Sequence, residues 1–457
     1  MPGIRTGNTN AGSSRRITHN NEMIARLERY FEFARLGTNW KTEILAGLTT
    51  FVTMAYIVFV NPSILRETGM PFQAVVAATC LCAAFGSILM GAVARYPIAL
   101  APGMGLNAYF TYTVVKGLGI PWQTALGAVF LSGIAFLILT LVGVRQLIVK
   151  AIPRDLYAAV AAGIGLFIAL IGLRNAGIIV PSAATLVTLG NMRDPNTLLA
   201  LFGLLAIAGL SAWRVRAAML IGILLTTLMG AVFGLVHWTP GVYRFSDLAA
   251  TAGQLDIRGA WNLGLAGIVF VFLFVDLFDN VGTLVGVGTS AGLFDADGEI
   301  PRVREILLCD ATATVAGSLM GTSTVTSYIE SAAGVAVGGR SGVTSIVTGL
   351  LFLAAMFLAP LVGAVPAAAT APALIVVGSL MLAHLSEVDW VDPVKAIPAF
   401  LTLITIPLTF SIANGLGFGF TSYALLKIVR GEIRSTHWLV YVLAALFIAR
   451  FVYLGAG

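Results

Sequence analysis

The chain has 457 residues, of which 58% are hydrophobic and only 11% are charged. Soluble domains carry about 25% charged residues, so this composition excludes an ordinary soluble protein and indicates an all-α polytopic membrane protein. The net charge is +6, but the basic residues fall in short loops, which is a signal of membrane topology and not a nucleic-acid-binding patch. The three cysteines, Cys80, Cys82 and Cys309, lie in apolar segments and form no metal set.

The N-terminal part of the chain precedes any membrane span. Residues 1–20 are polar and of low complexity, whereas residues 22–36 are amphipathic. In such a helix, apolar side chains such as Leu27 lie in the membrane interface while basic ones such as Arg29 face lipid phosphates. We therefore expect residues 1–40 to form a tail with an interfacial helix.

Fourteen apolar segments follow, in two sets of seven. The first set lies at about 44–64, 72–93, 97–115, 123–143, 155–173, 197–212 and 217–237. The second set lies at about 262–287, 306–320, 322–336, 342–363, 371–386, 396–411 and 413–429. A last apolar run, 437–455, contains Arg450 and forms an extra C-terminal helix, which either spans the membrane or lies at its interface.

Basic residues cluster after the fourth, sixth, tenth and fourteenth segments. They are Arg145, Lys150, Arg154, Arg214, Arg216, Arg340, Lys427, Arg430 and Arg434. With the N-terminus in the cytoplasm, all four clusters fall on the cytoplasmic side, as the positive-inside rule expects. The pattern predicts a multi-pass protein of the cell (inner) membrane with a cytoplasmic N-terminus.

The two sets of segments have the spacing of an internal repeat. The first and eighth, third and tenth, and fourth and eleventh segments start about 218 to 225 residues apart, and Phe59–Pro62 lies over Phe278–Val281 at one such offset. Seven is odd, so the second repeat must be inverted relative to the first. Inverted repeats are typical of secondary transporters. We predict repeats at 41–240 and 261–430, followed by the extra helix within 431–457.

The third and tenth segments are poor lipid-facing helices. Residues 101–110 contain a proline and two glycines, and residues 321–331 contain a Ser/Thr run that favours an extended backbone before a short helix opens near Tyr328. Backbone freed in this way is tolerated only where protein or a water-lined cavity satisfies it. Corresponding interruptions in the two halves point to a binding site. Candidate substrate-binding residues in them are Asn107, Ala108, Ser323 and Thr324; interhelical hydrogen bonding is the alternative role for the Ser/Thr run.

Three acids lie in or beside these membrane segments. Asp276 and Asp279 share one face of the eighth segment because they are three residues apart, and Glu330 lies at the opening of the tenth-segment half-helix. An intramembrane acid is a candidate functional residue by default, although an acid satisfied by hydroxyls or helix ends remains the structural alternative. Asp310, in the ninth segment, is a weaker candidate.

Four motifs carry a resemblance to a known family. Residues 50–65 (TFVTMAYIVFVNPSIL), 101–110 (APGMGLNAYF), 274–286 (FVDLFDNVGTLVG) and 322–345 (TSTVTSYIESAAGVAVGGRSGVTS) resemble the AzgA-like purine permeases of the nucleobase/cation symporter group. The resemblance implies seven-plus-seven inverted repeats, a core domain and a gate domain. It also implies proton-coupled uptake of adenine, guanine or hypoxanthine by a protein that is not an enzyme, and a homodimer is common in related folds.

The resemblance also indicates site residues. The uracil permease branch has a Glu-His-Ile-Gly-His stretch on its eighth helix, and the similar stretch here places Asp279 at the acid and Thr283 at a histidine position. The tenth-helix Glu-Asn of that branch resembles Glu330-Ser331. Because histidine and asparagine are replaced here, the proton path need not be the same.

The chemistry of a purine suits such a site. A carboxylate accepts from ring or exocyclic N–H groups, and charge-assisted hydrogen bonds contribute about 1.5–3 kcal/mol each. Aromatic side chains such as Phe278 could stack on the base. Protonation of Glu330, Asp279 or Asp276 would couple a proton gradient to uptake, with the proton as the coupling ion and no other cofactor.

Two other functions are compatible with parts of the pattern. Sulfate and bicarbonate transporters share this architecture, but their anions favour a cation between the third and tenth helices, where this chain has Glu330 and no lysine or arginine. An intramembrane aspartyl hydrolase needs two acids on facing elements around a water, whereas Asp276 and Asp279 lie on one helix.

Overall fold

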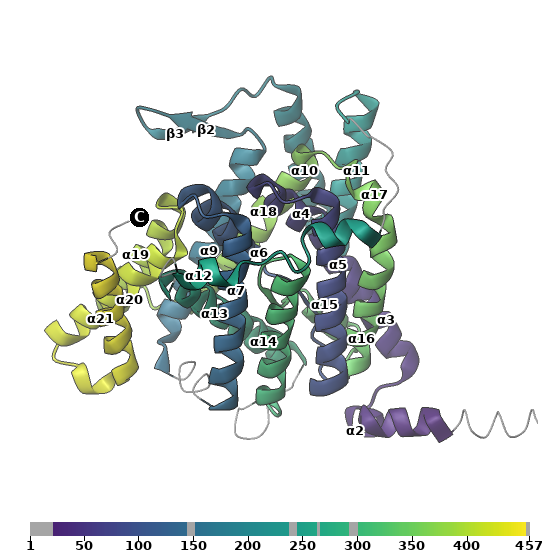
Figure 1. Cartoon of the computed structure of the whole chain (residues 1–457), viewed down its shortest axis with the longest axis horizontal. Helices are drawn as coiled ribbons and strands as arrows, with labels where there is room; N and C mark the ends of the chain where they lie inside the picture. Colours follow the sequence, from purple (N-terminus) through teal and green to yellow (C-terminus); the bar gives the residue numbers. More distant parts are fainter. Residues whose placement is uncertain (1–21, 144–150, 237–244, 263–265, 292–299, 454–457) are drawn as a thin grey trace, which may run out of the picture.

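The computed structural model describes residues 22–143, 151–236, 245–262, 266–291 and 300–453. The predicted polar start (1–20) and the basic residues Arg145 and Lys150 lie outside these ranges. The described chain is a bundle of helices with two short two-stranded sheets (Figure 1).

The helices follow the predicted order of segments. The first half contains α2 (Phe33–Leu36), α3 (Trp40–Met54), α4 (Ile57–Leu65), η1 (Arg66–Thr68), α5 (Phe72–Leu89), η2 (Met90–Ala94), β1 (Leu100–Pro102), α6 (Met104–Ala108), η3 (Tyr109–Gly117), α7 (Trp122–Leu141), α9 (Arg154–Asn175), β2 (Ile179–Ser182), β3 (Leu186–Leu189), α10 (Pro195–Ala212) and α11 (Ala218–Val232). The short η4 (Phe245–Ala250) and α12 (Ile257–Asn262) connect the halves.

The second half repeats this pattern. It contains α13 (Ala266–Ala291), α14 (Val303–Met320), β4 (Val325–Ser327), α15 (Ser331–Ala336), α16 (Gly342–Ala355), η5 (Met356–Leu358), α17 (Ala359–Val362), α18 (Ala367–Met381), η6 (Leu382–Glu387), α19 (Pro393–Leu408), α20 (Ile412–Val429), η7 (Ile433–Ser435) and α21 (Trp438–Tyr453). Seven helices of the described chain are long and apolar enough to cross a membrane, and four further apolar helices are shorter. The repeat boundaries 41–240 and 261–430 stay predictions.

The extra C-terminal helix, α21, packs against α20. The Arg450 guanidinium donates a hydrogen bond to Asn414 Oδ1 at 3.2 Å, so the charge that interrupts this apolar run meets a polar partner on the neighbouring helix. The N-terminal helix and the β2–β3 hairpin lie at opposite ends of the bundle (Figure 1).

Two groups of helices account for most of the close helix packing. In the first group α5, α7, α13, α14 and α16 pack with the α3–α4 segment, and in the second group α9, α10, α11, α18, α19 and α20 pack together. The first group corresponds to the core domain that the resemblance implies, and the second to the gate domain. They are called the core group and the gate group below. Glycine brings helices of the first group close together: a Cβ on Gly342 would lie 2.0 Å from the Gly91 carbonyl oxygen.

The two predicted interruptions meet each other. Strands β1 and β4 pair antiparallel, with Leu100 opposite Ser327 and Pro102 opposite Val325. The inverted repeats therefore place equivalent segments head to head, and each satisfies backbone groups that the other's helix break leaves free. Helix α15 begins at Ser331 and not near Tyr328, because the Tyr328 amide still donates to the Ala99 carbonyl and continues the strand pairing.

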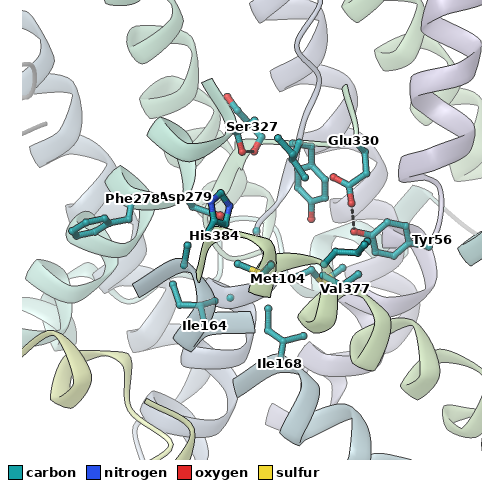
Figure 2. Close-up of a pocket in the computed structure, with 18 of the residues that line it drawn as sticks. Tyr56, Met104, Ile164, Ile168, Phe278, Asp279, Ser327, Glu330, Val377 and His384 are labelled. Atoms are coloured by element: carbon teal, nitrogen blue, oxygen red, sulfur yellow. Dashed lines mark hydrogen bonds between the residues drawn. The ribbon is translucent and has the colours of Figure 1, made fainter. Parts of the chain in front are cut away.

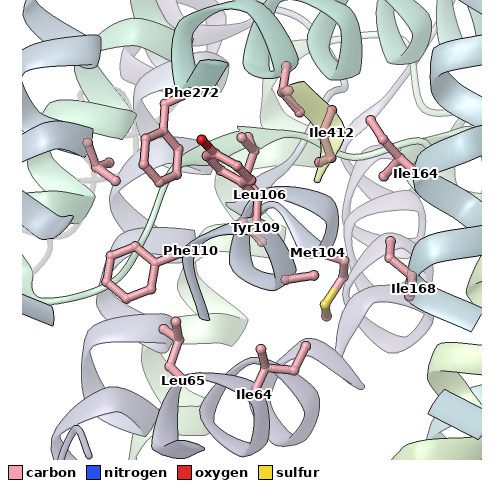
Figure 3. Packing of buried hydrophobic residues seen from close by; sticks show 14 of the residues in the cluster. Ile64, Leu65, Met104, Leu106, Tyr109, Phe110, Ile164, Ile168, Phe272 and Ile412 are labelled. Carbon is pink, nitrogen blue, oxygen red and sulfur yellow. The ribbon is translucent and has the colours of Figure 1, made fainter. Parts of the chain in front are cut away.

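An apolar core surrounds the third segment. Tyr109 and Phe110 pack on Phe272 of α13, with ring centroids 5.1 and 6.4 Å away (Figure 3). Ile64 and Leu65 of α4 belong to the same buried cluster. This packing holds the short helix α6 and its extended neighbour β1 in place beside α13, where the candidate acids lie.

Candidate functional site

A cavity of about 390 Å³ lies between the two helix groups. Ligand pockets typically measure about 300–1,000 Å³, so it has room for a small molecule. One side of the cavity is lined by the core group and the interrupted segments around β1 and β4, with Tyr56, Gly103, Met104, Gly105, Phe278, Asp279, Thr283, Ser327, Tyr328, Ile329 and Glu330. The other side is lined by the gate group and η6, with Tyr157, Ala161, Ile164, Ile168, Met219, Val377, Leu380, Met381 and His384. The polar wall thus comes mainly from the core group, and the apolar wall from the gate group.

Asp279 enters this cavity from α13. Its Oδ2 lies 3.4 Å from where a Cβ on Gly103 would be, so the absence of a side chain at Gly103 leaves space beside the carboxylate. Within the described residues, no hydrogen bond or ion pair to the Asp279 carboxylate is found. A carboxylate placed in this way is available to a ligand.

Glu330 lies across the cavity from Asp279 (Figure 2). It occupies the N-cap position of α15, but its side chain makes no capping hydrogen bond. Glu330 Oε1 instead accepts a hydrogen bond from the Tyr56 hydroxyl at 2.7 Å. The expected interaction with the half-helix amides is therefore replaced by a contact with Tyr56, in the turn between α3 and α4.

The tenth segment also places Ser327 on the polar wall. Asn280 Nδ2 donates to Ser327 Oγ, and Thr283 Oγ1 donates to the Ser327 carbonyl, both at 3.1 Å. Because Asn280 directly follows Asp279 on α13 and Thr283 lies about one turn further along the helix, these bonds fix strand β4 against the helix that carries the acid.

Of the sequence-predicted residues, Asp279, Glu330, Phe278 and Thr283 come together around the cavity. The others lie behind it: Asp276, Asn107, Ala108, Ser323 and Thr324 are fully buried and do not belong to the lining.

Asn107 and Ser323 belong to a polar network behind the site. Ser323 donates to Asn107, Asn107 donates to Asn61, and Asn61 donates to Thr79 at 2.8 Å and to Thr322 at 3.1 Å. The network joins α4, α5, α6 and the approach to β4. Its contacts hold the interrupted third and tenth segments together where they cross. This crossing shapes the polar wall of the cavity.

Several lining residues were missed by sequence reasoning. Tyr56 lies in the motif at residues 50–65 and Ser327 in the motif at 322–345. Their place in these motifs could have indicated a role in the site. His384 lines the cavity from η6 and contacts Glu387 at 2.9 Å. The apolar residues of α9 and α18, such as Ile164 and Val377, carry no sequence signal that separates them from other lipid-span residues.

The lining of the cavity is acidic. Two carboxylates enter it, and none of its described residues is lysine or arginine. Aromatic rings lie at its edge: Phe278 stacks on Tyr157 at 5.4 Å between centroids. The site suits a flat neutral molecule with N–H donors better than an anion.

The Xan_ur_permease model of the Permease family matches residues 41–452. The chain belongs to this family. It is therefore a permease and not a hydrolase. A putative permease of Methanocaldococcus jannaschii is 56% identical over 94% of this chain and 98% of its own length.

The names of two further relatives state their substrates. The adenine permease AdeP of Escherichia coli is 47% identical over 94% of this chain and 97% of its own length. The guanine/hypoxanthine permease PbuG of Bacillus subtilis is 46% identical over 94% of this chain and 100% of its own length.

Solved transporters share the fold of this permease. The transmembrane domain of the cyanobacterial bicarbonate transporter BicA superposes with a TM-score of 0.65 at 17% identity, over 83% of this chain and 98% of that domain. Murine Slc26a9, an anion transporter in the inward-facing state, gives 0.64 at 11% identity, over 86% of this chain and 69% of its own. These similarities support a polytopic membrane fold of seven-plus-seven inverted repeats, and at such identities they concern the fold alone.

Proposed function

We propose that this permease imports purine nucleobases (adenine, guanine or hypoxanthine) by proton symport. The observation that carries the proposal is the pair of carboxylates, Asp279 and Glu330, which enter one cavity whose opposite wall is largely apolar. The substrates named for AdeP and PbuG belong to the same chemical class.

In this proposal the base lies between the two helix groups. Asp279 accepts hydrogen bonds from N–H groups of the base, and Glu330 anchors a second edge. Phe278 presents an aromatic ring, while Ile164, Ile168 and Val377 cover the opposite side. The apolar wall favours a flat ring system, and the acids select rings that bear N–H groups.

Proton coupling follows from placing two carboxylates in one water-poor cavity. A doubly ionised pair next to an apolar wall costs free energy, so binding of a neutral base is favoured when one acid is protonated. We assign this proton to Glu330 or Asp279. Asp276 lies one helical turn from Asp279 and is buried outside the lining, so in this scheme it is an intermediate position for the proton.

The membrane arrangement is part of the proposal. We place the N-terminus in the cytoplasm and the chain in the cell (inner) membrane, because the basic clusters after the fourth, sixth, tenth and fourteenth segments then share one side. A homodimer through the gate group is the expected assembly.

Anion transport is the competing function, since BicA and Slc26a9 share the fold. The acidic lining argues against it, because no described lining residue supplies a lysine or arginine for an anion. A bound anion would instead meet two carboxylates.

Flux measurements separate these functions. Purified permease in proteoliposomes should accumulate radiolabelled purine when the outside is more acidic than the inside, and a protonophore should abolish the accumulation. Excess unlabelled purine should compete, whereas bicarbonate and sulfate should not. Anion flux without purine flux would refute the proposal, and purine flux that ignores the pH gradient would refute the proton coupling alone.

A further inference from the structure

The hydroxyl groups around the cavity are almost all committed to protein acceptors. Five of the described lining residues carry a hydroxyl. Four of these hydroxyls donate within the protein: Tyr56 to Glu330, Tyr157 to the Phe278 carbonyl, Thr283 to the Ser327 carbonyl, and Tyr328 to the Pro102 carbonyl. The fifth is Ser327.

The Ser327 hydroxyl is held in place but keeps its proton for another partner. Its Oγ accepts from Asn280 Nδ2 at 3.1 Å, and no acceptor for its own O–H is found in the described part of the chain. Burial of a hydroxyl without an acceptor is unfavourable. The Ser327 O–H is therefore the hydroxyl donor of this cavity that a ligand can use.

The order of groups along the polar wall defines a pattern. Figure 2 shows Ser327 between Asp279 and Glu330. Two carboxylates that accept hydrogen bonds thus flank one hydroxyl that donates. A complementary ligand edge has an acceptor between two N–H donors.

The proposed substrates differ at this edge. Hypoxanthine and guanine carry an oxygen at C6, with N1–H on one side and, in the N7–H tautomer, N7–H on the other. Adenine carries an amino group at C6 and no hydrogen on N1, so its central group donates where Ser327 also donates. A buried pair of donors leaves one of them unsatisfied.

On the basis of the proposed function, we infer that the Ser327 hydroxyl donates to the C6 oxygen of the base and makes this permease selective for 6-oxopurines over adenine. Ser327 is then a specificity-determining residue, and Asn280 is the positioning residue that orients it. Asp279 and Glu330 accept from the N–H groups on either side of the C6 oxygen, and Ser327 recognises the C6 oxygen itself.

The test combines a change in the protein with a change in the ligand. Ser327→Ala removes the donor, and unsubstituted purine lacks the C6 oxygen. Dissociation constants of purified permease for hypoxanthine, purine and adenine are measured in detergent by competition against a radiolabelled base. We expect Ser327→Ala to weaken hypoxanthine binding about three- to tenfold and to leave purine binding unchanged, because a lost neutral hydrogen bond has this size.

Ser318→Ala is the matched control. Ser318 is a buried serine whose hydroxyl donates to the Val315 carbonyl on its own helix, and it lies outside the lining. This variant should bind all three bases as the wild type does.

The outcomes separate this inference from the proposed function. If the wild type binds none of the bases, the proposed function is wrong. If the wild type binds them, the inference is overturned when Ser327→Ala weakens the binding of hypoxanthine and of unsubstituted purine equally. It is also overturned when Ser327→Ala weakens the binding of neither base. If Ser327→Ala does not fold, the wild type alone decides: hypoxanthine should bind about tenfold more tightly than adenine, and equal or tighter binding of adenine overturns the inference.

Discussion

The Tyr157 hydroxyl of α9 donates a hydrogen bond to the backbone carbonyl of Phe278 on α13. The two rings also stack, with centroids 5.4 Å apart and planes 30° apart. Tyr157 belongs to the gate group and Phe278 directly precedes Asp279. The contact therefore joins the two helix groups at the residue next to the candidate substrate-binding acid.

Tyr157→Phe should separate binding from conformational exchange. The variant keeps the stacked ring and loses only the hydrogen bond, so the dissociation constant for purine should change less than about threefold. If the helix groups move against each other during transport, this bond breaks in every cycle, and its loss should raise the exchange rate about two- to tenfold. Counterflow at saturating purine measures that rate. An unchanged rate would show that the bond is not broken in the rate-limiting step.

Glu330→Gln should remove the pH dependence of purine accumulation. The amide keeps the shape of the side chain but cannot carry the coupled proton. The measurement is uptake against external pH in proteoliposomes. Tyr56→Phe is the matched control, because it removes the hydrogen bond to Glu330 and leaves the carboxyl group in place, so it should retain a pH-dependent profile. A wild-type profile in Glu330→Gln would move the coupled proton to Asp279 or Asp276.

Much of this architecture could be predicted from the sequence. The apolar segments, their constant offset and the proline, glycine and Ser/Thr interruptions are local properties. They predicted short extended stretches in the third and tenth segments, where the structure has the strands Leu100–Pro102 and Val325–Ser327. The acids Asp279 and Glu330 stand out in apolar surroundings, because a charge in lipid is costly.

The partners of those residues could not be predicted in the same way. The contact between Tyr56 and Glu330 joins residues 274 positions apart, and only the folded packing brings them together. Asn107 and Ser323 looked like ligand-binding residues because they are polar, but in the structure they satisfy each other behind the cavity. Polarity in a membrane segment predicts a hydrogen-bond partner, and the fold decides whether that partner is protein or ligand.

A buried acid outside the cavity should matter for stability and not for binding. Glu43 of α3 is fully buried and accepts hydrogen bonds from the Arg340 and Ser341 amides and from the Thr38 and Thr344 hydroxyls. All four partners are donors, so the amide group of Glu43→Gln would place a donor against a donor.

We expect Glu43→Gln to lower the free energy of unfolding by about 1–3 kcal/mol. The change should appear as a lower melting temperature of the detergent-solubilised permease, with the affinity for purine unchanged. Glu28→Gln is the control: Glu28 is half-buried and accepts a hydrogen bond from the Trp40 indole, and it should melt close to the wild type. A wild-type melting temperature for Glu43→Gln would show that these hydrogen bonds contribute little to stability.

The most direct measurement is purine binding by the wild type and by Asp279→Asn. The carboxamide keeps the shape of the side chain but removes the charge that meets the N–H groups of the base, and losing one or two charge-assisted hydrogen bonds should weaken binding by at least about tenfold. Both proteins are purified in detergent, checked for equal monodispersity and titrated with hypoxanthine by calorimetry. We predict a measurable dissociation constant for the wild type and severely weakened or lost binding for Asp279→Asn. Wild-type affinity in Asp279→Asn would contradict the assignment of this cavity as the purine site.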